Sequence, residues 1–197
     1  AKIRGLERHG DAVDATESGA RIAVNLQGVS TEEIARGDLV TEPGAVASTT
    51  TFDARLRWMA GKASLEDAAS VELLTGTAER RARVALLGAH PIAPGERGFC
   101  RVHVDGDGLP MLPGDRFVLR GFSRDAGVGS TLGGGVVLDV APPHRRRIDP
   151  LLTEELERLD GGDVADGLAV RIERAGLEGM REARLALELS LIHISEP

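Results

Sequence analysis

The chain has 197 residues, 42% of them hydrophobic, and its formal net charge is -7. This length predicts one or two domains with a proper core, and the negative charge excludes a simple basic nucleic-acid binder, so such contacts would need a local arginine cluster. Cys100 is the sole cysteine, which excludes an internal disulfide and a cysteine-based zinc site and fits the reducing cytoplasm. We find no signal peptide and no apolar run long enough to cross a membrane, and the abrupt start without an initiator methionine indicates a fragment.

Residues 1–142 predict β-structure, because short alternating segments are separated by Gly, Pro and Asp as in small antiparallel barrels. The predicted strands cover residues 2–10, 20–26, 38–40, 48–59, 70–76, 77–88, 98–105, 116–122 and 135–142. Segments 35–40 and 112–120 both place a turn ending in Gly-Asp before a strand. This repetition predicts two small barrels in series that join near residues 41–48.

The strand within residues 18–28 carries an arginine where a barrel usually places an apolar or small residue. Ile22, Val24 and Leu26 alternate onto one face, and Arg21 belongs to the opposite face. The role of this arginine is the first functional question that the sequence raises.

One short helical turn is predicted between strands at residues 30–37. Ser30 or Thr31 is the expected N-cap, and Glu33 is placed to reach back in a capping box. Gly37 is the expected end of the turn.

The sequence offers no catalytic or metal-binding constellation. Its five histidines show no ligand spacing, and Asp105 and Asp107 surround a glycine in a pattern that favours a hairpin turn over a calcium loop. The glycine-rich residues 129–140 run into a strand instead of a helix, so they offer no helix N-terminus to a phosphate. Their glycines predict a bend or a close approach of another backbone. On these grounds the chain is predicted to be a binding module.

Arginines supply almost all of the positive charge. Arg81 and Arg83 fall on one strand face, and Arg116, Arg120 and Arg124 follow later in the chain. A β-surface with several arginines can hold a nucleic-acid backbone through charge-assisted bonds to phosphate. The alternative is a solvated face balanced by nearby Asp and Glu.

The pattern becomes helical after residues 141–150, whose two prolines and three consecutive arginines predict an exposed linker. The first helix is expected to open at Asp149-Pro150 and to close at Gly161-Gly162. Its predicted apolar stripe consists of Leu151, Leu152, Leu156 and Leu159.

Two further helical runs, 163–176 and 177–189, predict the start of a helix-turn-helix or winged-helix unit that lacks its wing strands. Residues 190–197 contain no Gly, Ala or Arg. We interpret them as a non-native tail similar to translated sequencing adapter and exclude them from the fold.

The order of these segments resembles the translational GTPases. Residues 19–40 ("GARIAVNLQGVSTEEIARGDLV") resemble the end of the second domain of that superfamily. Residues 90–147 resemble the third domain, with "PGD", "RFVLR" and "TLGGGVV" motifs similar to those of elongation factor Tu. The asparagine in "AVNLQG", the "RGFS…TLGGGVVLD" ending and the "PPHRRR" exit favour the selenocysteine-specific elongation factors within this superfamily.

This resemblance implies a mainly β fold with two translation-factor-type barrels, the first incomplete, followed by a short truncated helical segment of winged-helix type. The implied domains are 1–45 (end of barrel domain II), 46–142 (barrel domain III), 143–150 (linker) and 151–189 (start of a winged-helix domain). GTP and Mg²⁺ would bind in a GTPase domain outside these residues, so no cofactor or catalytic residue is expected in the fragment. The implied partners are selenocysteinyl-tRNA, the ribosome and, through further winged-helix domains, an mRNA recoding hairpin, with no membrane.

The same resemblance places Arg21 in the pocket for the aminoacyl group, with Arg4 and His9 as further candidates. A fixed guanidinium would favour an ionised selenol over the serine hydroxyl by ~1.5–3 kcal/mol, which is about tenfold to a hundredfold in affinity. A salt bridge from Arg21 to a domain outside this chain is the structural alternative.

For the tRNA body, the resemblance implies contacts from Arg120, Gly121 and Thr131, with Arg116 and Arg124 as neighbours in sequence. Two other interpretations stay open. The chain could come from another translational GTPase, such as a relative of elongation factor Tu or of an initiation factor, or it could be a non-catalytic β-barrel adaptor for proteins or lipids.

Overall fold

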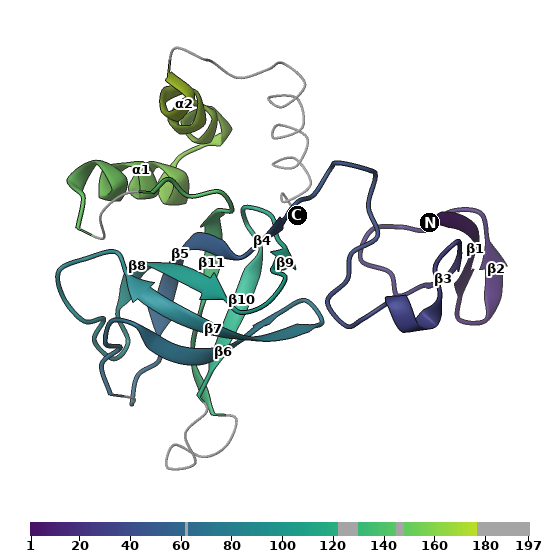
Figure 1. Ribbon diagram of the computed structural model, residues 1–197, viewed down its shortest axis with the longest axis horizontal. Helices are drawn as coiled ribbons and strands as arrows, with labels where there is room; N and C mark the ends of the chain where they lie inside the picture. Colours follow the sequence, from purple (N-terminus) through teal and green to yellow (C-terminus); the bar gives the residue numbers. More distant parts are fainter. Residues whose placement is uncertain (62, 122–129, 145–147, 177–197) are drawn as a thin grey trace. The chain divides into compact units, whose positions relative to one another are not determined.

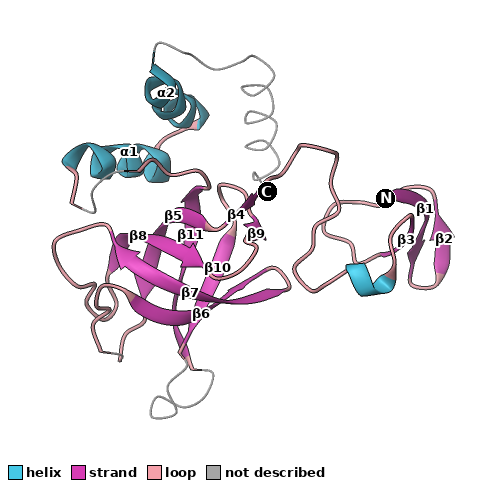
Figure 2. Ribbon diagram, viewed as in Figure 1, coloured by secondary structure: helices cyan, strands magenta, loops and turns pink. Residues whose placement is uncertain are grey.

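The computed structural model describes residues 1–61, 63–121, 130–144 and 148–176. The chain divides into two compact units, Ala1–Arg36 and Gly37–Pro197, and each is described by itself. Strands dominate the described residues, whose α-helices are α1 (Pro150–Gly161) and α2 (Val164–Ala175), as Figure 2 shows. The prediction of a mainly β fold is therefore confirmed. Across the described ranges, no helix is both long and apolar enough to cross a membrane.

The first unit is a small antiparallel sheet with the strand order β2-β1-β3. Its strands are β1 (Lys2–Arg8), β2 (Asp11–Val13) and β3 (Ala23–Gln27). The strand predicted over residues 2–10 ends early because His9 and Gly10 adopt positive φ angles of 55° and 94° and turn the chain into β2.

One face of this sheet is more buried than the other. Ile22, Val24 and Leu26 are half-buried, whereas Arg21 and Asn25 are exposed, so the predicted alternation is confirmed. None of residues 1–36 is fully buried. The sheet therefore has an apolar side but no closed core of its own.

The helical turn after β3 is shorter than predicted, since the 3-10 helix η1 covers only Thr31–Glu33. The backbone N–H of Ser30 donates to Glu33 Oε2 at 2.7 Å, which confirms the capping box. This hydrogen bond lowers the pKa of the Glu33 carboxyl. Gly37 does not end the turn; it belongs to the second unit, where its N–H donates to Thr77 Oγ1 at 2.9 Å.

The second unit is built around a closed antiparallel barrel with the strand order β10-β11-β5-β8-β7-β6 (Figure 1). Phe52 and Phe117 meet edge to face inside it, with ring centroids 5.6 Å apart. Closure of the barrel pairs every one of these strands on both sides, so none remains an open edge. The barrel strands are β5 (Thr51–Trp58), β6 (Ala69–Thr75), β7 (Ala78–Leu86), β8 (Arg97–Val104), β10 (Arg116–Arg120) and β11 (Thr131–Asp139).

Two local predictions for this unit are wrong. Residues 38–40 form no strand, so only the second Gly-Asp turn leads directly into a strand, β10. The turn at residues 105–108 does not close a hairpin, because β9 (Leu109–Pro110) pairs with β4 (Ser48–Thr49) instead of β8. The described residues contain one closed barrel, and the membership of the first unit in a second barrel stays a prediction.

The glycines of β11 allow a close approach of neighbouring backbones, as predicted. A Cβ atom on Gly133 would lie 2.6 Å from the carbonyl oxygen of Arg57, and one on Gly134 would lie 2.7 Å from the carbonyl oxygen of Phe117. Larger residues would therefore push β11 away from β5 and β10.

Helix α1 packs against the outside of the barrel. Leu152 and Leu156 are buried together with Leu87 and Leu138 of the barrel. The predicted limits are confirmed, since Asp149 caps the start of α1 and Gly162 caps its end. Leu151 is 62% exposed, so its place in the predicted apolar stripe is wrong. The predicted helix at 177–189 and the tail at 190–197 lie outside the described residues.

Candidate aminoacyl and RNA-binding surfaces

Arg21 lies on the exposed side of the first unit, just before β3 begins. Within residues 1–36 and the rest of the described chain, it has no hydrogen-bond or ion-pair partner. All five guanidinium donors are therefore available to a ligand or to another part of the protein.

Arg4 and His9 are the other two residues predicted for the aminoacyl pocket. Arg4 forms a β-bulge in β1, and its Nε donates to Gln27 Oε1 at 2.8 Å. Gln27 ends β3 whereas Arg21 precedes its start, so these two residues lie about 20 Å apart along an extended chain. The structure thus directs Arg4 away from Arg21, and it places His9 in the turn between β1 and β2.

A row of charged residues crosses the outer face of β10, β6 and β7. Arg120 pairs with Glu72, and Glu72 pairs with Arg81 on its other side. The Arg120 Nη1 atom is 3.3 Å from Glu72 Oε2 and 4.0 Å from Glu79 Oε1. The adjacent Glu79 carboxyl and partial burial raise the pKa of Glu72. The guanidinium of Arg120 is therefore shared with acidic neighbours, in line with the solvated-face alternative.

Arg83 sits in a different electrostatic setting on the same face. Burial alternates along β7, which confirms that Arg81 and Arg83 both point outward. Arg83 pairs with Ser70 on β6 and with His103 on β8. Its side chain has no hydrogen-bond or ion-pair partner in the described part of the chain, so it is available to an anionic ligand.

Three of the residues predicted to contact the tRNA body come together at one end of the β10–β11 hairpin. Arg120 pairs with Thr131 in the sheet, and the Gly121 N–H donates to the carbonyl oxygen of Ser130 at 3.1 Å. Arg116 lies at the other end of β10, about 13 Å away along the strand. Arg124 lies outside the described residues.

Sequence reasoning missed a buried charge cluster between the barrel and the helices. Asp53 on β5 is fully buried and is held by Arg101, whose Nε donates to Oδ1 at 2.7 Å and whose Nη2 donates to Oδ2 at 2.9 Å. Asp139 on β11 lies opposite Asp53 and is held by Arg174 of α2. The Arg174 Nε also donates to Glu155 Oε2 at 2.8 Å.

Burial dominates the electrostatics of Asp53. It raises the pKa of Asp53, and the hydrogen bonds from Arg101 act in the opposite direction. The same bonds raise the pKa of Arg101, so its guanidinium stays charged. Asp53 occupies an outward position of β5, and a register shift between Val137 and Asp139 brings Asp139 opposite it. A sequence pattern alone therefore does not predict that the two carboxylates are buried together. Across the described ranges, no group of three or more His, Cys, Asp or Glu residues is arranged to hold a metal ion.

The barrel matches a known domain. Residues 52–144 match the family described as "Selenocysteine-specific elongation factor, beta-barrel domain". This range contains five of the barrel strands completely and all of β5 but its first residue. The barrel is therefore similar to the beta-barrel domain of the selenocysteine-specific elongation factors.

Two curated relatives are similar to the chain beyond the barrel itself. A selenocysteine-specific elongation factor from Desulfomicrobium baculatum is 27% identical over 188 residues, which are 95% of this chain and 29% of that protein. Elongation factor Tu 2 from Streptomyces avermitilis is 27% identical over 136 residues, which are 65% of this chain and 34% of that protein. The chain thus spans about a third or less of the length of either relative.

Proposed function

We propose that this chain is part of a selenocysteine-specific elongation factor that brings selenocysteinyl-tRNA to the ribosome at a recoded stop codon. The main support is the family match, which spans the whole closed barrel apart from a single residue. The similarity to the Desulfomicrobium baculatum factor extends this support to 95% of the chain. GTP and Mg²⁺ would act in a GTPase domain outside these residues, and we assign no catalytic residue here.

The proposed domain assignment follows the family order. Residues 1–45 would complete barrel domain II, 46–142 would be barrel domain III, 143–150 the linker and 151–189 the start of a winged-helix domain. The observed division between Arg36 and Gly37 lies about nine residues before the first of these boundaries. An mRNA hairpin would be bound by further winged-helix domains.

Arg21 is proposed to recognise the selenocysteine side chain. Its exposure and its lack of a partner among the described residues leave the guanidinium available for a selenolate. A selenol is largely ionised near neutral pH, whereas the hydroxyl of a seryl ester is neutral, so a charge-assisted bond distinguishes the two. Arg4 and His9 are proposed as weaker contributors, because Arg4 is bonded to Gln27 and His9 is fixed in a turn.

The barrel is proposed to contact the tRNA body through its arginine-bearing outer face. Arg120, Gly121 and Thr131 form one contact region at the end of the β10–β11 hairpin. Arg116 and Arg124 are proposed as secondary contacts, since Arg116 lies at the far end of β10.

The similarity to elongation factor Tu 2 supports a second candidate, a translational GTPase that is not specific for selenocysteine. A binding assay separates the candidates. The purified chain is titrated with a selenocysteine tRNA transcript and with an elongator tRNA transcript at low and high salt. We expect salt-sensitive binding that favours the selenocysteine tRNA. Equal affinities would favour the second candidate, and no binding to either RNA would favour a protein or lipid adaptor.

A further inference from the structure

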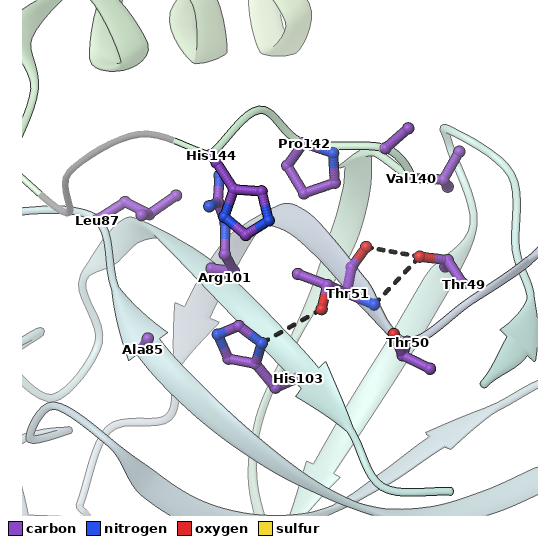
Figure 3. Close-up of a pocket in the computed structure, with 11 residues that line it drawn as sticks. Thr49, Thr50, Thr51, Ala85, Leu87, Arg101, His103, Val140, Pro142 and His144 are labelled. Atoms are coloured by element: carbon purple, nitrogen blue, oxygen red, sulfur yellow. Dashed lines mark hydrogen bonds between the residues drawn. The ribbon is translucent and has the colours of Figure 1, made fainter. Parts of the chain in front are cut away.

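A pocket opens on the outer face of the barrel, between β5, β8 and the segment that follows β11 (Figure 3). Its volume is about 430 Å³, and the side chains that can donate hydrogen bonds into it come from Thr50, Arg101, His103 and His144. No carboxylate side chain is among the described residues that line it, although the chain as a whole carries a net charge of -7. The ionisable side chains that line the pocket in this part of the chain are therefore basic, and the nearest carboxylate is the buried Asp53 behind Arg101.

Arg101 forms a fixed part of the pocket wall. Its Nε and Nη2 atoms donate to the two carboxylate oxygens of the buried Asp53, which locks the plane of the guanidinium. The Nη1 atom takes no part in that pair and keeps its donors for another group. Only 11% of the Arg101 side chain is exposed, so the side chain is already ordered and loses little conformational freedom when a ligand binds.

His103 is oriented by a neighbouring threonine. Its Nδ1 lies 3.2 Å from Thr51 Oγ1, and Figure 3 shows Nε2 on the other side of the ring. When the threonine hydroxyl donates to Nδ1, Nε2 carries the proton and becomes a donor to a ligand. Burial, together with the charges of Arg101 and Arg83, lowers the pKa of His103, and the charge of Asp53 acts in the opposite direction.

The positive charge continues along the barrel from this pocket. Arg83 pairs with His103 across β7 and β8, and Arg81 lies two positions along β7, about 7 Å away. Both arginines line a second pocket, together with Ser70 and Asp105. A ligand with successive negative charges would thus meet Arg83 and Arg81 beyond the first pocket, with Asp105 as the one acidic side chain among the described residues that line the second.

We propose that this pocket binds a phosphate group, held by Arg101, His103 and the Thr50 hydroxyl. A tetrahedral oxyanion can accept hydrogen bonds from several directions at once, which matches donors that line the pocket from β8 and from the residue before β5. The phosphate would come either from an RNA backbone that continues over Arg83 or from a small phosphate compound. The residues of this pocket are not among the tRNA contacts proposed above, so either proposal can fail without the other.

The test is a titration followed by NMR on the Cε1–H signals of the five histidines in the whole chain. Inorganic phosphate is added first, and a short RNA duplex is added in a separate series. We expect the His103 and His144 signals to move together to saturation while His9 and His90 stay in place, and we expect phosphate to raise the pKa of His103. Saturation by the duplex at lower concentrations than by inorganic phosphate identifies an RNA backbone as the source. Saturation by inorganic phosphate alone identifies a small compound.

Variants separate the pocket from general charge effects. His103→Gln is expected to weaken phosphate binding about tenfold, whereas His90→Gln, which changes a histidine outside the pocket, is expected to leave it unchanged. Unselective movement of all histidine signals, no movement at all, or equal losses in both variants would overturn the proposal. The measurement on the unmodified chain decides the question even if a variant fails to fold.

Discussion

Asp53 and Asp139 lie directly opposite each other on β5 and β11, and both are buried where helices α1 and α2 meet the barrel. Two neighbouring buried carboxylates repel each other, and both can stay ionised only if each has a cationic partner. Arg101 of the barrel serves Asp53, and Arg174 of α2 serves Asp139. The fold of the barrel and the position of the helix pair therefore depend on each other.

Removal of the helical cation tests this dependence. Arg174→Met leaves Asp139 buried without its charge partner, and we expect the free energy of unfolding in urea to fall by about 3–5 kcal/mol. Arg158→Met is the matched control, because Arg158 forms an exposed pair with Glu173 at 2.7 Å and exposed pairs contribute little to stability. Equal effects of the two substitutions would show that the buried cluster does not anchor the helices.

His103 contributes to the change of folding stability with pH. Burial and neighbouring arginines lower its pKa in the folded protein, so the unfolded chain binds the proton more readily. Its contribution to stability is therefore complete above the unfolded pKa of about 6.5 and is lost as pH falls through the folded value. Urea unfolding between about pH 8 and 5 should show a weaker pH dependence in His103→Gln than in the unmodified chain. His90→Gln should retain the original dependence, and a loss of slope there would contradict the assignment to His103.

Replacement of a glycine in β11 by a larger residue is expected to disturb the packing of β11 against its neighbouring strands. A Cβ atom on Gly135 would meet the carbonyl oxygen of Arg55 and would lie 2.7 Å from Cζ of Phe117. We expect Gly135→Ala to lower the free energy of unfolding by about 1–3 kcal/mol or more. Gly88→Ala serves as the control because no atom lies within 4 Å of its added Cβ. Thermal unfolding of both variants measures the difference, and an unaffected Gly135→Ala protein would contradict the observed strand packing.

RNA binding by the barrel predicts a specific salt dependence. If Arg83 contacts a phosphate, Arg83→Ala should weaken RNA binding and reduce the slope of log affinity against log salt by about one. Arg97→Ala is the control, since Arg97 lies at the opposite end of β8 from the partner of Arg83. The measurement is fluorescence anisotropy with labelled RNA at several salt concentrations. An unchanged slope in Arg83→Ala would remove Arg83 from the interface.

Much of the local structure could be predicted from the sequence because it depends on short-range chemistry. The alternation around Val24, the capping box of Glu33 and the Asp149 cap of α1 each involve residues close in the chain. The glycines of β11 also predicted a close approach of another backbone, although only the structure identifies β5 and β10 as the neighbouring strands.

The buried charge cluster and the pocket could not be predicted from the sequence, because both depend on pairing between residues far apart in the chain. Asp53, Arg101 and Arg174 come from two strands and a helix far apart in the chain, and nothing in their local sequence predicts that they meet. The pocket around His103 has the same origin, because its lining residues meet only after the barrel closes. Similarly, Leu39 and Val40 fit a strand by composition, but none of the strands in the described ranges pairs with them.

The most direct test of the proposed function uses the full-length factor and its two aminoacyl-tRNAs. The affinities for selenocysteinyl-tRNA and seryl-tRNA are measured for the unmodified protein and for Arg21→Ala. A fixed guanidinium facing the selenolate predicts that the substitution reduces the preference for selenocysteinyl-tRNA about tenfold or more, while the affinity for uncharged tRNA stays the same. Equal losses for both aminoacyl-tRNAs, or an unchanged preference, would contradict the assignment of Arg21 to the aminoacyl pocket.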